Sequence, residues 1–205
     1  MIEVHTGEVV EVKAGEKAVV LEGGEVVVLM LGHAVVLDGG FATVFDGGNA
    51  EVLDGGKATV LDGGLVKVYE GGKAEVRNGK AIVQDNGNAN VYEGGEAIVH
   101  WRGVVKVHDG GRAKVYDSGV AWVYAGGEAV VQEGGKAKVL DGGLSTVHPG
   151  GKAVVQEGGK ALVFEDGQAT VFSGGEAVIH EGGTATGPGE IIYADLPTEE
   201  SAPNI

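Results

Sequence analysis

The sequence predicts an all-β protein made of a single parallel β-solenoid, and three observations support this prediction. An octapeptide of the form Gly-x-Ala-x-Val-x-Asp-Gly recurs almost without interruption from Gly24 to Gly183. Glycine accounts for 40 of the 205 residues, which excludes long helices. Within each octad, apolar and polar residues alternate as they do in half-buried strands. A short fixed period indicates one structural unit stacked on itself.

Residues 56–63 are typical of the repeat. Ala58 and Val60 are two positions apart, so an extended segment places both on its inner face and Lys57 and Thr59 on its outer face. The following Asp-Gly-Gly is a corner sequence, because Asp bonds to nearby backbone and Gly accepts positive φ. Each octad is therefore expected to be one short strand and one corner.

The corner residue before the glycines is usually acidic, and the exceptions predict the size of a coil. All six exceptions belong to one class of every third octad: Met30, Asn78, Trp101, Ala125, Pro149 and Ser173. This pattern predicts a triangular β-helix with three octapeptide strands per coil and about seven coils. The same coil stacks Tyr69, Tyr92 and Tyr116 on one face. The residue missing between Gly72 and Gly79 predicts a shortened corner near Asn78, with the strand register kept.

The pattern divides the chain into three parts. Residues 1–23 are expected to form an irregular N-terminal coil or cap, residues 24–186 the regular solenoid, and residues 187–205 a C-terminal cap with an acidic tail. The third octad is apolar on both faces. A solenoid must protect its end strands, so we expect this octad to be capped and the protein to be a monomer. The alternative is a dimer that forms through Leu29, Met30 and Leu31.

The formal net charge of −15 argues against nucleic-acid and anionic-membrane binding and favours a basic protein partner. The chain has no cysteine and no apolar run long enough to span a bilayer. Its first residues lack the basic and apolar regions of a signal peptide, so a cytoplasmic location is expected.

Catalytic and metal sites are not expected. The six histidines do not occupy one position in adjacent coils of the three-octad arrangement, which argues against a metal site. No serine is expected to lie next to a histidine and an acidic residue that could complete a catalytic triad. We therefore predict a protein that is not an enzyme and has no cofactor. The alternative is calcium bound between carboxylates of the acidic corner ladders.

In the triangular coil, one edge collects aromatic and basic residues and lacks corner acids. This edge predicts a partner-binding patch, because Trp, Tyr and Arg are enriched at binding hot spots. The predicted contact residues are His100, Trp101, Arg102, Trp122, Tyr124 and His148. The acids expected to steer a basic partner are Asp62, Asp85 and Asp109. The alternative is that Trp101 and Trp122 only stack on each other and stiffen a corner.

The Gly-Gly-x-Ala repeats and the ending Gly-Gly-Thr-Ala-Thr-Gly at residues 182–187 resemble the passenger repeats of bacterial autotransporter adhesins. This resemblance implies a β-solenoid. Charge and the predicted patch favour an acidic, non-enzymatic protein-binding solenoid that masks a basic partner, such as an inhibitor or a toxin-neutralising immunity protein. The alternative function is a structural or adhesive solenoid, such as a phage fibre segment or cell-surface repeat that binds saccharide or a surface.

Overall fold

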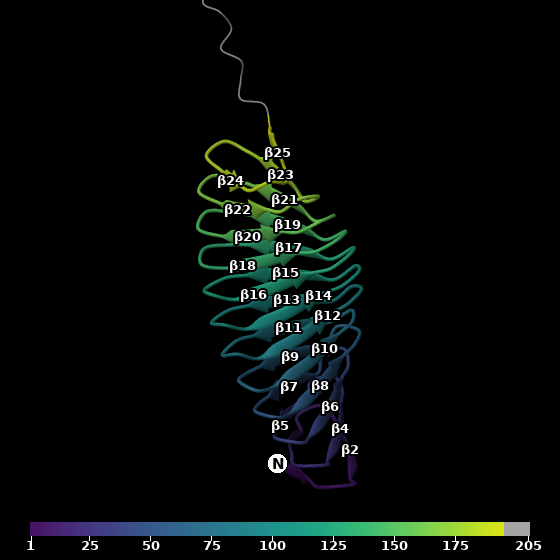
Figure 1. The fold of residues 1–205 in the computed structure, drawn as a ribbon. Coiled ribbons are helices and arrows are strands. Elements are labelled where there is room, and N and C mark those ends of the chain that lie inside the picture. Colours follow the sequence, from purple (N-terminus) through teal and green to yellow (C-terminus); the bar gives the residue numbers. More distant parts are fainter. Residues whose placement is uncertain (195–205) are drawn as a thin grey trace, which may run out of the picture.

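The computed structural model describes residues 1–194 and confirms a parallel β-solenoid (Figure 1). Within these residues the structure has 25 strands and no helix, and every strand pairing is parallel. The strands form two sheets that face each other across the core. We call them the odd sheet, of 13 strands, and the even sheet, of 12 strands, after the strand numbers.

The bounds of the strands follow the octads. The odd sheet contains β1 (Ile2–Val4), β3 (Lys17–Val20), β5 (His33–Val36), β7 (Asn49–Val52), β9 (Leu65–Val68), β11 (Lys80–Val83), β13 (Glu96–Val99), β15 (Arg112–Val115), β17 (Glu128–Val131), β19 (Leu144–Val147), β21 (Lys160–Val163), β23 (Glu176–Ile179) and β25 (Glu190–Tyr193). The even sheet contains β2 (Val9–Val12), β4 (Glu25–Val28), β6 (Phe41–Val44), β8 (Lys57–Val60), β10 (Lys73–Val76), β12 (Asn88–Val91), β14 (Val104–Val107), β16 (Val120–Val123), β18 (Lys136–Val139), β20 (Lys152–Val155), β22 (Gln168–Val171) and β24 (Thr184–Thr186).

The predicted triangular coil is wrong, because each coil contains two octads. Lys136 is in register with Lys152, two octads later, and the same spacing recurs along both sheets except across the shortened corner and before β25. The 25 strands, two per coil, therefore make about twelve coils. Tyr69 and Tyr116 follow odd strands, whereas Tyr92 follows an even strand, so the three tyrosines do not form one stack.

The corners explain why a coil closes after two octads. In the corner after β13, the Gly103 amide donates to the His100 carbonyl at 2.8 Å, which is the hydrogen bond of a β-turn. This turn reverses the chain, so the next strand lies in the opposite sheet. The small Ala and Val side chains also fill the thin space between two facing sheets, which a wider triangular interior would leave empty.

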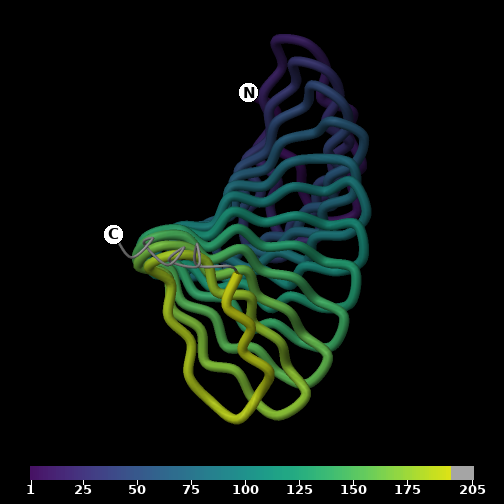
Figure 2. The backbone as a smooth tube through the Cα atoms, turned by 90° about the horizontal axis from the view of Figure 1, so that it is seen from above, coloured from purple at the N-terminus to yellow at the C-terminus, as the bar shows by residue number. Residues whose placement is uncertain are grey.

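The core is a stack of similar layers. From β2 to β22 the inward residues of a strand are an alanine, valine or serine followed by a valine, and Val36, Val68 and Val139 are fully buried. Like residues lie on like residues in neighbouring coils: Ala97 is in register with Ala113, and Val99 with Val115. Seen from above, successive coils are rotated, so the solenoid twists along its length (Figure 2).

The prediction for the shortened corner is confirmed. Arg77, Asn78 and Gly79 join β10 to β11 with three residues where neighbouring corners have four. Across this corner the register spacing is shorter by one position, with Lys73 opposite Asn88, and both sheets continue.

The first coils do not form an irregular cap. Residues 1–20 contain β1, β2 and β3, which continue both sheets in register with β4 and β5. At the other end, β25 pairs with β23 as one more strand. The rest of the predicted C-terminal segment, residues 195–205, lies outside the described residues.

Candidate functional site

Corners after odd strands line one edge of the solenoid, the odd edge, and corners after even strands line the even edge. From the corner after β3 onward, a four-residue corner has glycine at its fourth position because the coil below leaves no room for a side chain; the first two corners, which have no coil below them, have Glu8 and Glu16 there. A Cβ on Gly103, for example, would lie 2.5 Å from the Val83 carbonyl oxygen. The third position is usually a glycine with positive φ, as at Gly94 (φ 68°). The usual corner is therefore a type II turn.

Three successive odd-edge corners depart from this rule. Their two central residues all have positive φ although none is glycine: Asp85 (49°) with Asn86 (63°), Trp101 (38°) with Arg102 (67°), and Asp117 (41°) with Ser118 (69°). A left-handed conformation costs an L-residue about 1–2 kcal/mol, less for Asp and Asn. Sustained strain of this kind is typical of functional positions, so these corners are the candidate site.

The tight turns hold the strained residues in place. In the corners after β11, β13 and β15, the fourth residue donates to the carbonyl of the first at 2.8, 2.8 and 2.7 Å. Above the site, the Ser118 amide donates to the Gly134 carbonyl of the next coil at 3.0 Å. Within residues 1–194, the amides of Asn86 and Arg102 have no backbone acceptor of this kind. They remain available to other acceptors.

These corners surround a shallow hollow of about 660 Å³. We call it the odd-edge patch, and its lining residues are Tyr69, Glu70, Asp85, Asn86, Trp101, Arg102, Asp117 and Ser118. Trp101 is 56 % exposed, so its ring is open to a ligand. The carboxylates, amide, hydroxyl and guanidinium around it supply hydrogen-bond donors and acceptors.

His100 supports the patch from below. Its Nδ1 lies 3.2 Å from Asp117 Oδ2, and its ring stacks on Tyr116 with a centroid distance of 5.0 Å. The Trp101 ring is tilted against the same imidazole at 5.7 Å. These contacts connect two neighbouring coils and position the indole at the surface.

The predicted partner-binding residues are only partly together. His100, Trp101 and Arg102 share one corner, but Trp122 lies on the outer face of β16 in the even sheet. Tyr124 is on the opposite, even edge, and His148 is on the odd edge three coils from His100. The proposed stacking of Trp101 on Trp122 does not occur, because Trp122 instead lies under the ammonium of Lys138 at 4.8 Å.

The predicted steering acids are also separated. Asp85 lines the odd-edge patch, whereas Asp62 and Asp109 belong to the even edge, three coils apart. The cause is the coil size. A spacing of three octads is one and a half coils, so octads three apart alternate between the two edges.

An aromatic stack on the even edge was not expected. Arg77 lies over Tyr92 at 4.6 Å, and His108 is sandwiched between Tyr92 at 4.8 Å and Tyr124 at 4.9 Å. Burial, and then the nearby Lys106 ammonium, lower the pKa of His108 below its usual value. The sequence signal for this stack was the recurrence of aromatic rings at a spacing of two octads. A second stack on the odd edge joins His148, Phe164 and His180.

Residues 1–194 contain no group of three or more His, Asp or Glu side chains arranged to hold a metal ion. The same residues include no helix that is long and apolar enough to cross a membrane.

No protein-family model matches the chain, and no curated protein matches it. Among solved structures, the chain is similar to the crystal structure of a hyper-glycosylated fragment of TibA, residues 55–350, whose glycosylation TibC catalysed. The two are 28% identical with a TM-score of 0.63, and the match covers 95% of this chain and 92% of the TibA fragment. This similarity supports the β-solenoid over nearly the whole chain.

Proposed function

We propose that the chain is a structural or adhesive β-solenoid that binds saccharide at the odd-edge patch. The observation that carries this proposal is the run of three strained corners that present Trp101 beside Asp85, Asn86 and Asp117. A flat aromatic ring packs against the C–H face of a sugar, while carboxylates and amides bond to its hydroxyls. The resemblance to adhesin passenger repeats and the similarity to the TibA solenoid support this function more than an inhibitor function.

The architecture suits this role. A solenoid without long loops presents rigid edges, so a corner patch needs little ordering when it binds a ligand. An adhesive function implies an exposed location in place of the cytoplasmic one expected from the first residues, and immunodetection on intact cells distinguishes the two.

The test is a glycan array probed with the protein and two variants. Trp101→Ala removes the exposed ring of the patch. Phe172→Ala removes another exposed aromatic ring, 48 % exposed, from a corner on the even edge. We expect Trp101→Ala to weaken binding to the selected glycan at least tenfold, because truncating a buried aromatic anchor commonly costs about 2 kcal/mol. The Phe172→Ala protein should bind as the parent does. Equal losses in both variants, or no glycan bound by the parent, contradict the proposal.

A basic protein partner is the second candidate. The observation that favours it is the ladder of Asp38, Asp54, Glu70 and Asp85 at successive odd-edge corners. Within residues 1–194, none of these four carboxylates lies in an ion pair. Affinity capture with the chain, followed by elution with salt, tests this function. Capture of one basic protein that survives Trp101→Ala but is lost when Asp54 and Asp85 become Asn favours it over saccharide binding.

A further inference from the structure

The outer face of the even sheet differs in charge from the rest of this acidic protein. From β12 to β24 its outward side chains include no carboxylate. In the middle of this stretch lie four lysines that we call the lysine face: Lys106, Lys136, Lys138 and Lys152. Lys136 and Lys152 are register partners and form one column along the solenoid axis. Lys106, Trp122 and Lys138 are register partners in three successive coils and form a second column. Register partners in each column are separated by roughly one coil spacing of 4.8 Å.

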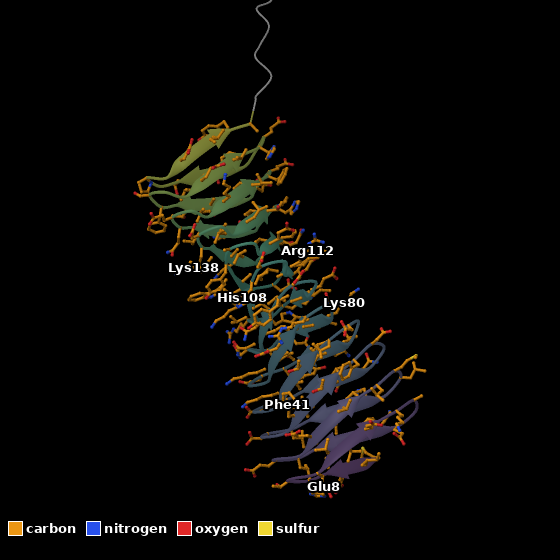
Figure 3. The ribbon with its side chains drawn as sticks, turned by 90° about the vertical axis from the view of Figure 1, so that its right-hand side faces the viewer. Glu8, Phe41, Lys80, His108, Arg112 and Lys138 are labelled. Atoms are coloured by element: carbon orange, nitrogen blue, oxygen red, sulfur yellow. The ribbon has the colours of Figure 1, made fainter. Side chains whose placement is uncertain are left out.

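These lysines are not neutralised within the described part of the chain. None of the four lies in an ion pair, although Lys138 Nζ is held 4.8 Å over the Trp122 ring. The odd sheet is different, because four of its six lysine and arginine side chains within residues 1–194 pair with a glutamate: Lys67, Lys80, Arg112 and Lys160 do, whereas Lys17 and Lys114 do not. Arg112 contacts Glu128 at 3.3 Å, and Lys160 contacts Glu176 at 2.9 Å. Figure 3 shows Lys138 on one side of the solenoid and Arg112 and Lys80 on the other.

The corners limit what can contact the lysine face. Acidic residues flank it on both edges: Asp109, Asp141 and Glu157 on the even edge, and Asp117 and Glu133 on the odd edge. Four-residue strands make the face only about 13 Å wide. A nucleic-acid duplex or an anionic bilayer extends over the acidic edges and is repelled there, whereas a single thin polyanion fits between them. A second copy of the chain, with the same net charge of −15, is also disfavoured.

From this charge pattern we infer that the lysine face binds a linear anionic polysaccharide that runs along the solenoid axis. The lysines contact its carboxylate or sulfate groups, and the apolar side chains next to them, Val120 in register with Lys136 and Val154 in register with Lys138, contact the C–H faces of its sugar rings. This site lies on a different surface from the odd-edge patch and does not depend on the proposed function.

The test measures binding of a heparin dodecasaccharide to the full chain by isothermal titration calorimetry at several salt concentrations. One variant replaces Lys106, Lys136, Lys138 and Lys152 with Gln. A control variant replaces four paired residues of the odd sheet, Lys67, Lys80, Arg112 and Lys160, with Gln. Both variants change the net charge by the same amount, so their difference reports position and not total charge.

We expect the parent to bind heparin with an affinity that falls as salt rises. The lysine-face variant should bind at least tenfold more weakly than the control variant, and neutral dextran should not bind. Trp101→Ala should leave heparin binding unchanged, which separates this inference from the proposed saccharide site. Three results overturn the inference: no heparin binding by the parent, equal losses in the two variants, or equally tight binding of duplex DNA or phosphatidylglycerol vesicles. Self-association that the lysine-face variant abolishes, without heparin binding, also overturns it and assigns the face to a second copy.

Discussion

Ser145 is the buried polar side chain of the core, and it occupies a position that is alanine in neighbouring coils. It is fully buried on β19, in register with Ala129 and Ala161. Among the buried side-chain oxygen and nitrogen atoms of residues 1–194, Ser145 Oγ is the one without a hydrogen-bond partner. A buried hydroxyl without a partner destabilises a protein by about 1–3 kcal/mol.

Ser145→Ala is therefore expected to stabilise the solenoid by about 1 kcal/mol. The matched control, Ala129→Ser, introduces a hydroxyl at the register position one coil earlier and should lower stability by a similar amount. Urea unfolding followed by circular dichroism measures both changes. A less stable Ser145→Ala protein would mean that the hydroxyl has a partner, such as a bound water.

The corner is the element on which both stability and the candidate site depend. Most corners use glycine to reach positive φ, whereas the odd-edge patch places Trp and Arg there. The conformational preference of Trp and Arg, which is for negative φ, thus disagrees with the backbone conformation that the fold imposes at the site. Such a disagreement is expected where a residue is selected for function and not for stability.

Arg102→Gly should stabilise the protein by about 1 kcal/mol, because glycine adopts the left-handed conformation (φ 67°) without the Cβ clash. The control is Gly134→Ala, at φ 73° in an odd-edge corner where an added Cβ has ordinary contact distances, and it should destabilise by a similar amount. Thermal unfolding measures both. If Arg102→Gly also weakens glycan binding, the residue that carries the backbone strain also contacts the glycan. If Arg102→Gly instead destabilises the protein, the corner is not strained.

The whole molecule is a repeating stack in which each coil contacts mainly its two neighbours. This arrangement depends on the coil length of two octads, which sets which residues become neighbours along each edge and face. The division into acidic edges, an odd sheet whose basic residues mostly form ion pairs, and a lysine-bearing even sheet exists only with this coil length.

Cysteine pairs measure the coil length directly. Thr43 and Thr59 are register partners on β6 and β8, so Cα atoms about 4.8 Å apart allow a disulfide in the Thr43→Cys/Thr59→Cys protein. In the control, Thr43→Cys/Lys67→Cys, the cysteines are three octads apart and lie on opposite sheets. We expect rapid oxidation of the first pair and none of the second, measured by mass spectrometry after mild oxidation. The reverse result would restore the triangular coil.

The octad pattern alone was sufficient to predict the strands, the inward Ala and Val residues, the corner glycines and the shortened corner at Asn78. These features are local, since alternation and turn chemistry act within a few residues. The number of octads per coil is not local. Both edges use nearly the same backbone, so corner exceptions three octads apart were compatible with a triangle although they lie on alternating edges.

Contacts between residues two octads apart in the chain therefore determine which side chains meet. They bring Trp101 beside Asp85 and Asp117, and they place Trp122 and Tyr124 elsewhere. They also gather four lysines on one face of an acidic protein. A turn hydrogen bond that reverses the chain, and a thin core that alanine and valine can fill, are the physical reasons for this arrangement.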